Sequence, residues 1–97
     1  MLTPKQRSFL SSMAQKIQPT VMLGKNGLTD AVHAQIRKEF GVRELLKLRF
    51  VDFKDTKNEL ANQIAENLSA ELVRVIGNVA VFYKPAEDPK DREIQLP

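Results

Sequence analysis

The chain has 97 residues, of which 42% are hydrophobic and 28% charged, so it can form one compact domain but is too short for two. It contains no cysteine and one histidine, which excludes a disulfide framework, a thiolate or histidine-rich metal site and a cysteine nucleophile. The formal net charge of +3 is too modest to identify a polyanion-binding protein by itself.

The N-terminal residues predict an amphipathic helix. Thr3 can cap it, Pro4 suits the first helical position, and Gln6 can close a capping box with Thr3. We expect Pro19 to end this helix, because proline cannot continue the hydrogen-bond ladder. Apolar residues recur at helical spacing before it, namely Phe9, Leu10, Met13, Ala14 and Ile17.

A short strand and a second helix should follow on either side of a glycine-containing loop. Residues 20–23 (TVML) are apolar enough for a buried strand, and Gly24-Lys25-Asn26-Gly27 comes directly after them. Thr29 or Asp30 can cap the next helix, and Gly41 is a natural stop. The apolar side of this helix is predicted to contain Leu28, Val32, Ile36 and Phe40.

The second half of the chain predicts a strand, a helix and a β-hairpin. Residues 45–51 alternate as a strand does, and residues 56–59 (TKNE) form a second potential capping box. Residues 72–76 and 79–84 are two further strands, and Gly77-Asn78 between them is typical of a two-residue hairpin turn. The buried side of the helix is predicted to be Leu60, Ala61, Ile64, Ala65 and Leu68.

The predicted element order, α-β-α-β-α-β-β, indicates a two-layer α/β sandwich with a mixed four-stranded sheet. Two β-α-β units favour right-handed crossovers and parallel pairing, and the final hairpin adds an antiparallel strand. Residues 1–85 form the predicted domain. Residues 86–97 are polar, charged and contain proline, which predicts an extended or loose tail.

Positive charge is concentrated in the first part of the chain. Residues 1–51 contain nine Lys or Arg against three Asp or Glu, a balance of +6, whereas residues 52–97 contain six against nine, a balance of −3. A one-sided basic field attracts polyanions such as nucleic acids. Ordinary surface charge would produce the same asymmetry, so charge alone does not decide the function.

The GxxG loop, Gly24-Lys25-Asn26-Gly27, is the stretch most suited to binding a ligand. Glycines permit tight turns and a close approach to the backbone, and the helix start that follows attracts a phosphate. A phosphate-binding loop for nucleotides would need its lysine after the second glycine, which this sequence lacks. A GxxG clamp on a nucleic-acid backbone fits, and a plain strand-to-helix turn remains the alternative.

Five stretches of the sequence match the pattern of one known family. They are residues 2–7 (LTPKQR), 18–29 (QPTVMLGKNGLT), 44–48 (ELLKL), 75–85 (VIGNVAVFYKP) and 93–97 (EIQLP). In them the chain resembles the CRM domain, the chloroplast RNA splicing and ribosome maturation module, and especially its free-standing bacterial YhbY-like form. The resemblance implies a fold similar to the C-terminal domain of a bacterial translation initiation factor. It also implies RNA binding and association with precursors of the large ribosomal subunit.

Basic residues outside the loop are candidates for further RNA contacts. Each has a simpler alternative as ordinary solvated surface, and Lys47 and Arg49 can contact RNA only if their face of the sheet is open. The predicted RNA-binding set is Gly24, Lys25, Asn26, Gly27, Thr29, His33, Arg37, Lys38, Lys5, Arg7, Lys47 and Arg49.

Three other features receive structural explanations. Phe82 and Tyr83 could stack on bases, but a strand in a hairpin buries at least one of them, and core positions are expected for both. The acidic residues Asp52, Asp55 and Glu59 suit a loop and helix start better than a magnesium site. No serine or acid is spaced with His33 in a way that argues for a catalytic triad.

The sequence therefore predicts a cytoplasmic, monomeric and non-enzymatic RNA-binding protein. It would need no cofactor or metal, act on no small-molecule substrate and not associate with a membrane, because no apolar run approaches the ~20 residues of a spanning helix. The alternatives are a protein–protein adaptor that docks on ribosomal proteins through its sheet and, more remotely, an enzyme.

Overall fold

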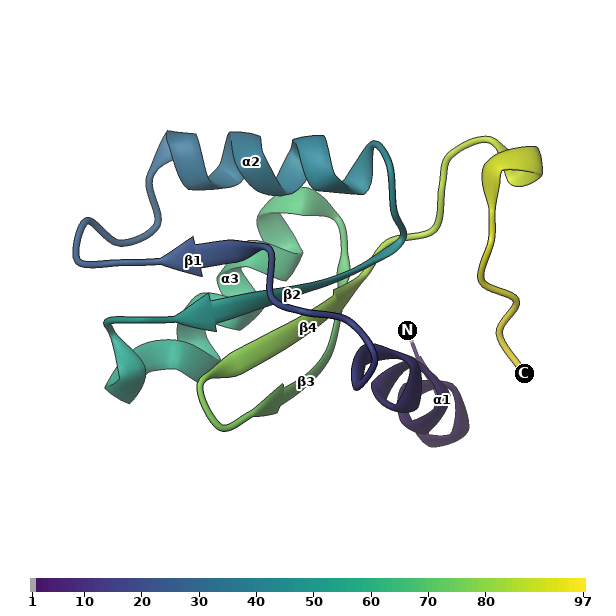
Figure 1. The fold of residues 1–97 in the computed structure, drawn as a ribbon, viewed down its shortest axis with the longest axis horizontal. Helices are drawn as coiled ribbons and strands as arrows, with labels where there is room; N and C mark the ends of the chain where they lie inside the picture. Colours follow the sequence, from purple (N-terminus) through teal and green to yellow (C-terminus); the bar gives the residue numbers. More distant parts are fainter. Residues whose placement is uncertain (1) are drawn as a thin grey trace.

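The structure is a computed structural model that describes residues 2–97. Within these residues the order of elements follows the predicted α-β-α-β-α-β-β pattern (Figure 1). The elements are α1 (Pro4–Ala14), β1 (Val21–Leu23), α2 (Asp30–Phe40), β2 (Leu45–Phe50), α3 (Lys57–Leu68), β3 (Glu71–Ile76) and β4 (Val79–Tyr83), with 3-10 turns η1 (Lys54–Thr56) and η2 (Pro89–Asp91). The predicted α/β class and mixed four-stranded sheet are confirmed.

The strands lie in the order β1-β2-β4-β3, with β1 and β2 parallel and the other two pairs antiparallel. The sequence predicts that β2 and β3, the two strands of the second β-α-β unit, pair with each other. This prediction is wrong, because β4 lies between them. The hairpin turn that places it there has a φ of 57° at Gly77. β4 takes the central position because its residues from Ala80 to Tyr83 are buried on both faces of the sheet.

Two apolar clusters lie on opposite faces of the sheet. On one face α2 and α3 cover Leu46, Leu48 and Phe50 of β2, together with Phe82 of β4. On the other face α1 covers only part of the sheet, where Leu10 packs in a cluster with residues such as Val81. Figure 1 shows α1 and the C-terminal tail at one end of the molecule, and the loop between β1 and α2 at the other.

The start of α1 is as predicted, but its end is not. Thr3 and Gln6 form the reciprocal capping box, yet the helix stops at Ala14 rather than near Pro19. The Nζ of Lys47 explains the early stop, because it donates to the carbonyl oxygens of Ala14 at 2.9 Å and Ile17 at 3.1 Å. A side chain from the sheet therefore satisfies carbonyls that another helical turn would have used.

The predicted capping box at the start of α3 does not form. The side chain of Thr56 makes no capping hydrogen bond to α3, and its hydroxyl instead donates to the carbonyl of Phe53 at 3.3 Å. Turn η1 occupies the space before the helix, so the chain enters α3 from a tighter turn than the pattern TKNE indicates.

The C-terminal residues are fastened to the domain by Glu44. This buried carboxylate accepts hydrogen bonds from the backbone N–H groups of Ala86, Glu93 and Ile94 at 2.8, 2.8 and 2.9 Å. Ile94 and Leu96 also pack against the cluster below α1. The tail, which the sequence predicts to be extended or loose, is therefore held against the domain.

Candidate nucleic-acid interface

The GxxG turn (residues 24–27) is a closed β-turn at one end of the molecule. The N–H of Gly27 donates to the carbonyl of Gly24 at 2.9 Å, which places Lys25 and Asn26 at the two central positions. Both side chains are exposed. The turn thus presents a cation and an amide to solvent from a fixed backbone.

The two glycines of this turn have different structural requirements. Gly27 has a φ of +73°, in the left-handed region that glycine adopts without strain. Gly24 has no positive φ, and a Cβ placed on it would meet nothing within 4 Å. The fold therefore explains the glycine at position 27, whereas position 24 has room for a side chain.

The start of α2 fixes the turn but is itself partly occupied. The hydroxyl oxygen of Thr29 accepts the N–H of Val32 at 3.2 Å, which confirms Thr29 as the helix cap. Asp30 places a carboxylate in the first helical turn. This negative charge already complements the helix dipole, so phosphate binding here would depend on Lys25 and the turn backbone more than on the helix N-terminus.

His33 links the first turn of α2 to α3. Its Nδ1 lies 3.1 Å from the carbonyl oxygen of Thr29, and its Nε2 lies 3.1 Å from the Nδ2 of Asn67. Since a carbonyl can only accept and an amide NH₂ can only donate, the two contacts together fit the tautomer protonated at Nδ1. Both ring nitrogens thus have partners within the protein, and His33 joins α2 to α3.

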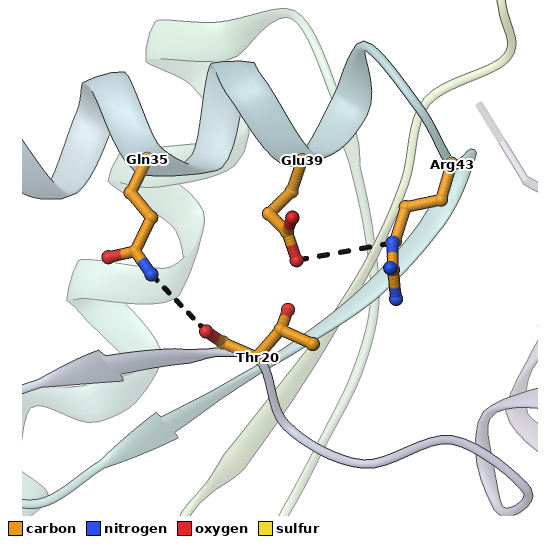
Figure 2. Close-up of polar contacts among 4 residues, drawn as sticks. All are labelled: Thr20, Gln35, Glu39 and Arg43. Carbon is orange, nitrogen blue, oxygen red and sulfur yellow. Dashed lines mark hydrogen bonds and ion pairs between the residues drawn. The ribbon is translucent and has the colours of Figure 1, made fainter.

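Further along α2 the side chains either contact neighbouring segments or are exposed. Figure 2 shows Gln35 Nε2 donating to the carbonyl of Thr20 at 3.3 Å, and Arg43 Nε lying 3.9 Å from Glu39 Oε1. Arg37 and Lys38 are exposed. The helical rise puts Arg37 about 12 Å from Thr29, and Arg37 lines a hollow beside the C-terminal tail.

Two of the basic residues that were predicted to contact RNA bind groups within the protein instead. Arg7 donates to the carbonyls of Leu72 and Val73 at 2.6 Å each, and Lys47 holds the end of α1 as described above. Lys5 is exposed on α1, at the opposite end of the molecule from the GxxG turn (Figure 1). The structure therefore does not bring these three residues together with the turn.

Arg49 lies on the half of the sheet that α1 leaves uncovered. A cross-strand row on this face consists of Met22, Arg49, Val79 and Ile76, which are paired in register from β1 to β3. Met22, Arg49 and Ile76 are exposed, and Val79 is half-buried. We call this row the open half-face. Arg49 therefore lies on an open part of the sheet, as contact with RNA requires. Lys47 does not, because it holds the end of α1.

The sequence reasoning missed Phe53 and Lys54, which lie beside the GxxG turn. The ring of Phe53 lies 3.5 Å from the place where a Cβ on Gly27 would be, and its side chain is 40% exposed. Lys54 is exposed next to it. A single aromatic residue within the charged run Asp52-Phe53-Lys54-Asp55 is the signal that could have identified it, since the other aromatics considered, Phe82 and Tyr83, are buried in the core as expected.

Among residues 2–97, no three His, Asp or Glu side chains gather closely enough to hold a metal ion. No helix in the same range is long and apolar enough to cross a membrane. Asp52, Asp55 and Glu59 thus lie at the entry to α3 without forming a ligand set.

The mixed four-stranded sheet with its helices and the exposed, lysine-bearing turn between a strand and a helix define a two-layer α/β module. The comparison with known families makes this specific. The chain belongs to the CRS1/YhbY (CRM) domain family, whose pattern matches residues 2–84.

Relatives of the same size occur in bacteria. The chain is 39% identical to an RNA-binding protein of Haemophilus influenzae, over 99% of this chain and 95% of that one. It is 36% identical to the probable RNA-binding protein YqeI of Bacillus subtilis, over the full length of both. It also resembles the solution structure of protein SAV1595 from Staphylococcus aureus, with a TM-score of 0.83, 38% identity and full coverage of both chains. The names of the two sequence relatives describe a binding role rather than a catalytic one.

Proposed function

We propose that the protein binds RNA through the GxxG turn, and that it does so without catalysing a reaction or holding a cofactor. The observation that carries this proposal is the exposed pair Lys25 and Asn26 on a closed, rigid turn. The names of the relatives support RNA as the partner. Such a turn contacts the sugar–phosphate backbone rather than base edges, so recognition depends mainly on RNA shape.

The RNA partner we propose is ribosomal RNA in precursors of the large ribosomal subunit. The protein would assist assembly of that subunit as a cytoplasmic monomer. Support comes from the resemblance to a ribosome maturation module and from the exposed cations Lys25, Lys38 and Arg49, which suit a polyanion. Lys5 and Arg37 are exposed as well and can extend the contact on a large RNA.

A protein–protein adaptor is the second candidate, and one observation favours it. Met22 and Ile76 of the open half-face are each about half exposed, at 48% and 51%. Exposed apolar side chains on a sheet can mark a protein interface. Arg49 between them in the row is equally suited to RNA, so the experiment below is chosen to separate the two functions.

The test replaces Lys25 with Glu and Asn26 with Asp, a change of three charge units at the turn. We expect the double variant to melt like the wild type, because exposed substitutions usually change stability by less than about 0.5 kcal/mol. Its binding to precursor large subunits and to purified RNA should be abolished, since two carboxylates would repel phosphate.

The matched control is Gln15→Asp with Lys16→Glu, an exposed pair near the end of α1 with the same change in charge. It should retain most of the binding. If the turn variant folds normally and binds precursor subunits and RNA as the wild type does, the turn is structural. Retained binding to precursor subunits with no measurable affinity for RNA would favour the adaptor.

A further inference from the structure

We propose that Phe53 is a stacking platform for an unpaired RNA base, placed next to the nucleotide whose backbone the GxxG turn holds. This inference rests on the proposed RNA binding and adds a second kind of contact to it. Nucleic-acid-binding proteins commonly combine a cationic track for the backbone with aromatic side chains on which bases stack. Phe53 and Lys25 supply these two elements from adjacent loops.

The backbone at Phe53 adopts a conformation that bulky residues avoid. Its φ of 57° lies in the left-handed region, where a Cβ is crowded. Such conformations persist where the surrounding structure enforces them, and they concentrate at functional sites. A buried core position would explain the strain by packing, but 40% of this side chain is exposed.

Hydrogen bonds on both sides of Phe53 enforce this conformation. Its N–H donates to the carboxylate of Asp52 at 2.7 Å, and its carbonyl accepts the N–H of Thr56 at 3.1 Å. Upstream, the N–H groups of Val51 and Asp52 donate to the carbonyl of Leu23 at 2.9 and 3.3 Å. The aromatic ring is thus presented from a fixed loop, which reduces the entropy that ordering on binding would cost.

The same hydrogen bonds join this loop to the GxxG turn. Leu23 is the residue before Gly24, so the loop after β2 is attached directly to the base of the turn. The ring of Phe53 then lies 3.5 Å from the position of a Cβ on Gly27. β1 and β2 are parallel neighbours, and the carboxyl ends of such strands are where open α/β sheets bind ligands.

The charges around the ring favour RNA over an uncharged apolar partner. Lys25 and Lys54 are exposed on the two loops, and Arg49 is exposed near the end of β2. Three carboxylates lie near them: Asp52, which accepts the N–H of Phe53, Asp55, which is exposed, and Asp30 in the first turn of α2. Two of these are already engaged, Asp52 by the N–H of Phe53 and Asp30 by the start of α2, so a backbone passing the ring meets Lys25 and Lys54 at the surface.

A tryptophan reporter tests the stacking directly. The chain contains no tryptophan, so Phe53→Trp introduces a single fluorophore at the proposed platform. The matched control is Phe9→Trp, because Phe9 is 39% exposed on α1, at the other end of the molecule. A short single-stranded RNA of mixed sequence should quench the emission of F53W strongly and leave that of F9W nearly unchanged.

An affinity measurement complements the reporter. Phe53→Asn removes the ring while keeping a residue that tolerates the left-handed region, so the variant should melt like the wild type. It should bind the single-stranded RNA about tenfold more weakly, a typical loss for one stacked base. Binding to a blunt RNA duplex of the same composition should be unchanged, because its bases are already stacked.

The outcomes separate this inference from the function on which it rests. If the wild type binds neither RNA, the proposed function fails and the platform fails with it. If the wild type binds but F53W is not quenched and F53N retains full affinity for single-stranded RNA, RNA binding stands and the platform is overturned. In that case the ring of Phe53 serves only to pack against Gly27.

Discussion

Gly24 and Gly27 look equivalent in the sequence, yet only one of them is required by the fold. Gly27 needs its positive φ, because the turn closes through its N–H and leads directly into the cap of α2. Gly24 has an ordinary φ and open space around it. If RNA approaches the backbone closely at this point, the absence of a Cβ at position 24 serves the ligand rather than the protein.

Alanine substitutions should therefore act differently at the two positions. Gly27→Ala is expected to lower the free energy of unfolding by about 1–2 kcal/mol, the cost of a left-handed alanine. Gly24→Ala should leave it unchanged or raise it by up to about 1 kcal/mol, because alanine restricts the unfolded chain. Urea unfolding of both variants measures this contrast, and an equal loss at both positions would contradict it.

The site was only partly predictable at the level of residues. Exposure of Lys25, Asn26 and Arg49 follows from a loop position and from strand alternation, and both patterns are visible in the sequence. The contacts of Arg7 and His33 with distant carbonyl and amide groups are not, since each depends on how helices are placed in space. Phe53 was missed because the sequence does not show the two features that single it out. These are its left-handed backbone conformation and the position of its ring beside Gly27, 26 positions earlier.

The elements themselves were more predictable than their ends. Periodicity located the three helices within residues 2–97 because each buries one apolar side, and alternation or a short apolar run located the four strands. Local motifs failed where a tertiary contact competed with them. Lys47 ends α1 before Pro19 can, and the hydroxyl of Thr56 bonds within turn η1 instead of capping α3. The position of β4 between β2 and β3 likewise reflects burial on both faces, which element order does not encode.

Glu44 is the side chain that ties the C-terminal residues to the sheet. Burial raises the pKa of its carboxyl, but the N–H groups of Ile94, Ala86 and Glu93 and the charge of Arg92 outweigh burial. The pKa of Glu44 therefore lies below its ordinary value of 4.5. Since the folded protein favours the carboxylate more than the unfolded chain does, the part of the stability that these hydrogen bonds contribute depends on the ionised form of Glu44.

This linkage predicts a loss of stability in acid. The contribution of Glu44 should be fully present above its unfolded pKa near 4.5 and should disappear as the pH falls through the lower pKa of the folded state. Urea unfolding between about pH 6 and about pH 3 measures it. Glu44→Gln should be less stable at neutral pH and lose part of this pH dependence, because its NH₂ cannot accept a backbone N–H.

Identical pH profiles for the wild type and Glu44→Gln would show that other carboxylates control the acid transition. Urea unfolding also tests the predicted domain boundary at residue 85. A chain ending there would lack Ile94 and Leu96 from the cluster under α1 and would leave Glu44 without its three donors. The structure thus leads us to treat residues 86–97 as part of what stabilises the domain.

At the scale of the whole molecule, the basic charge serves two purposes. Some cations hold the fold together by donating to backbone carbonyls, as Arg7, Lys47 and Lys84 do. Others remain exposed: Lys25 lies in the GxxG turn, and Arg49 pairs with Met22, two residues before that turn. The balance of +6 in residues 1–51 therefore overstates the charge available to RNA, and a count of exposed cations near the turn is the better guide.

Salt dependence of RNA binding distinguishes these two groups of cations. Each phosphate that a cation neutralises should contribute about −0.7 to −0.9 to the slope of log affinity against log salt concentration. Arg49→Met should reduce the magnitude of that slope by about this amount with little change in melting temperature.

Lys47→Met removes the same charge two residues away on the same strand, but it should leave the slope unchanged. It should lower stability by about 1–3 kcal/mol, because carbonyls at the end of α1 lose their donor. Titrations of RNA at several salt concentrations, with melting curves for both variants, measure the two effects. If Lys47→Met reduces the slope as much as Arg49→Met does, Lys47 leaves the end of α1 to contact RNA, and the sheet face under that helix opens on binding.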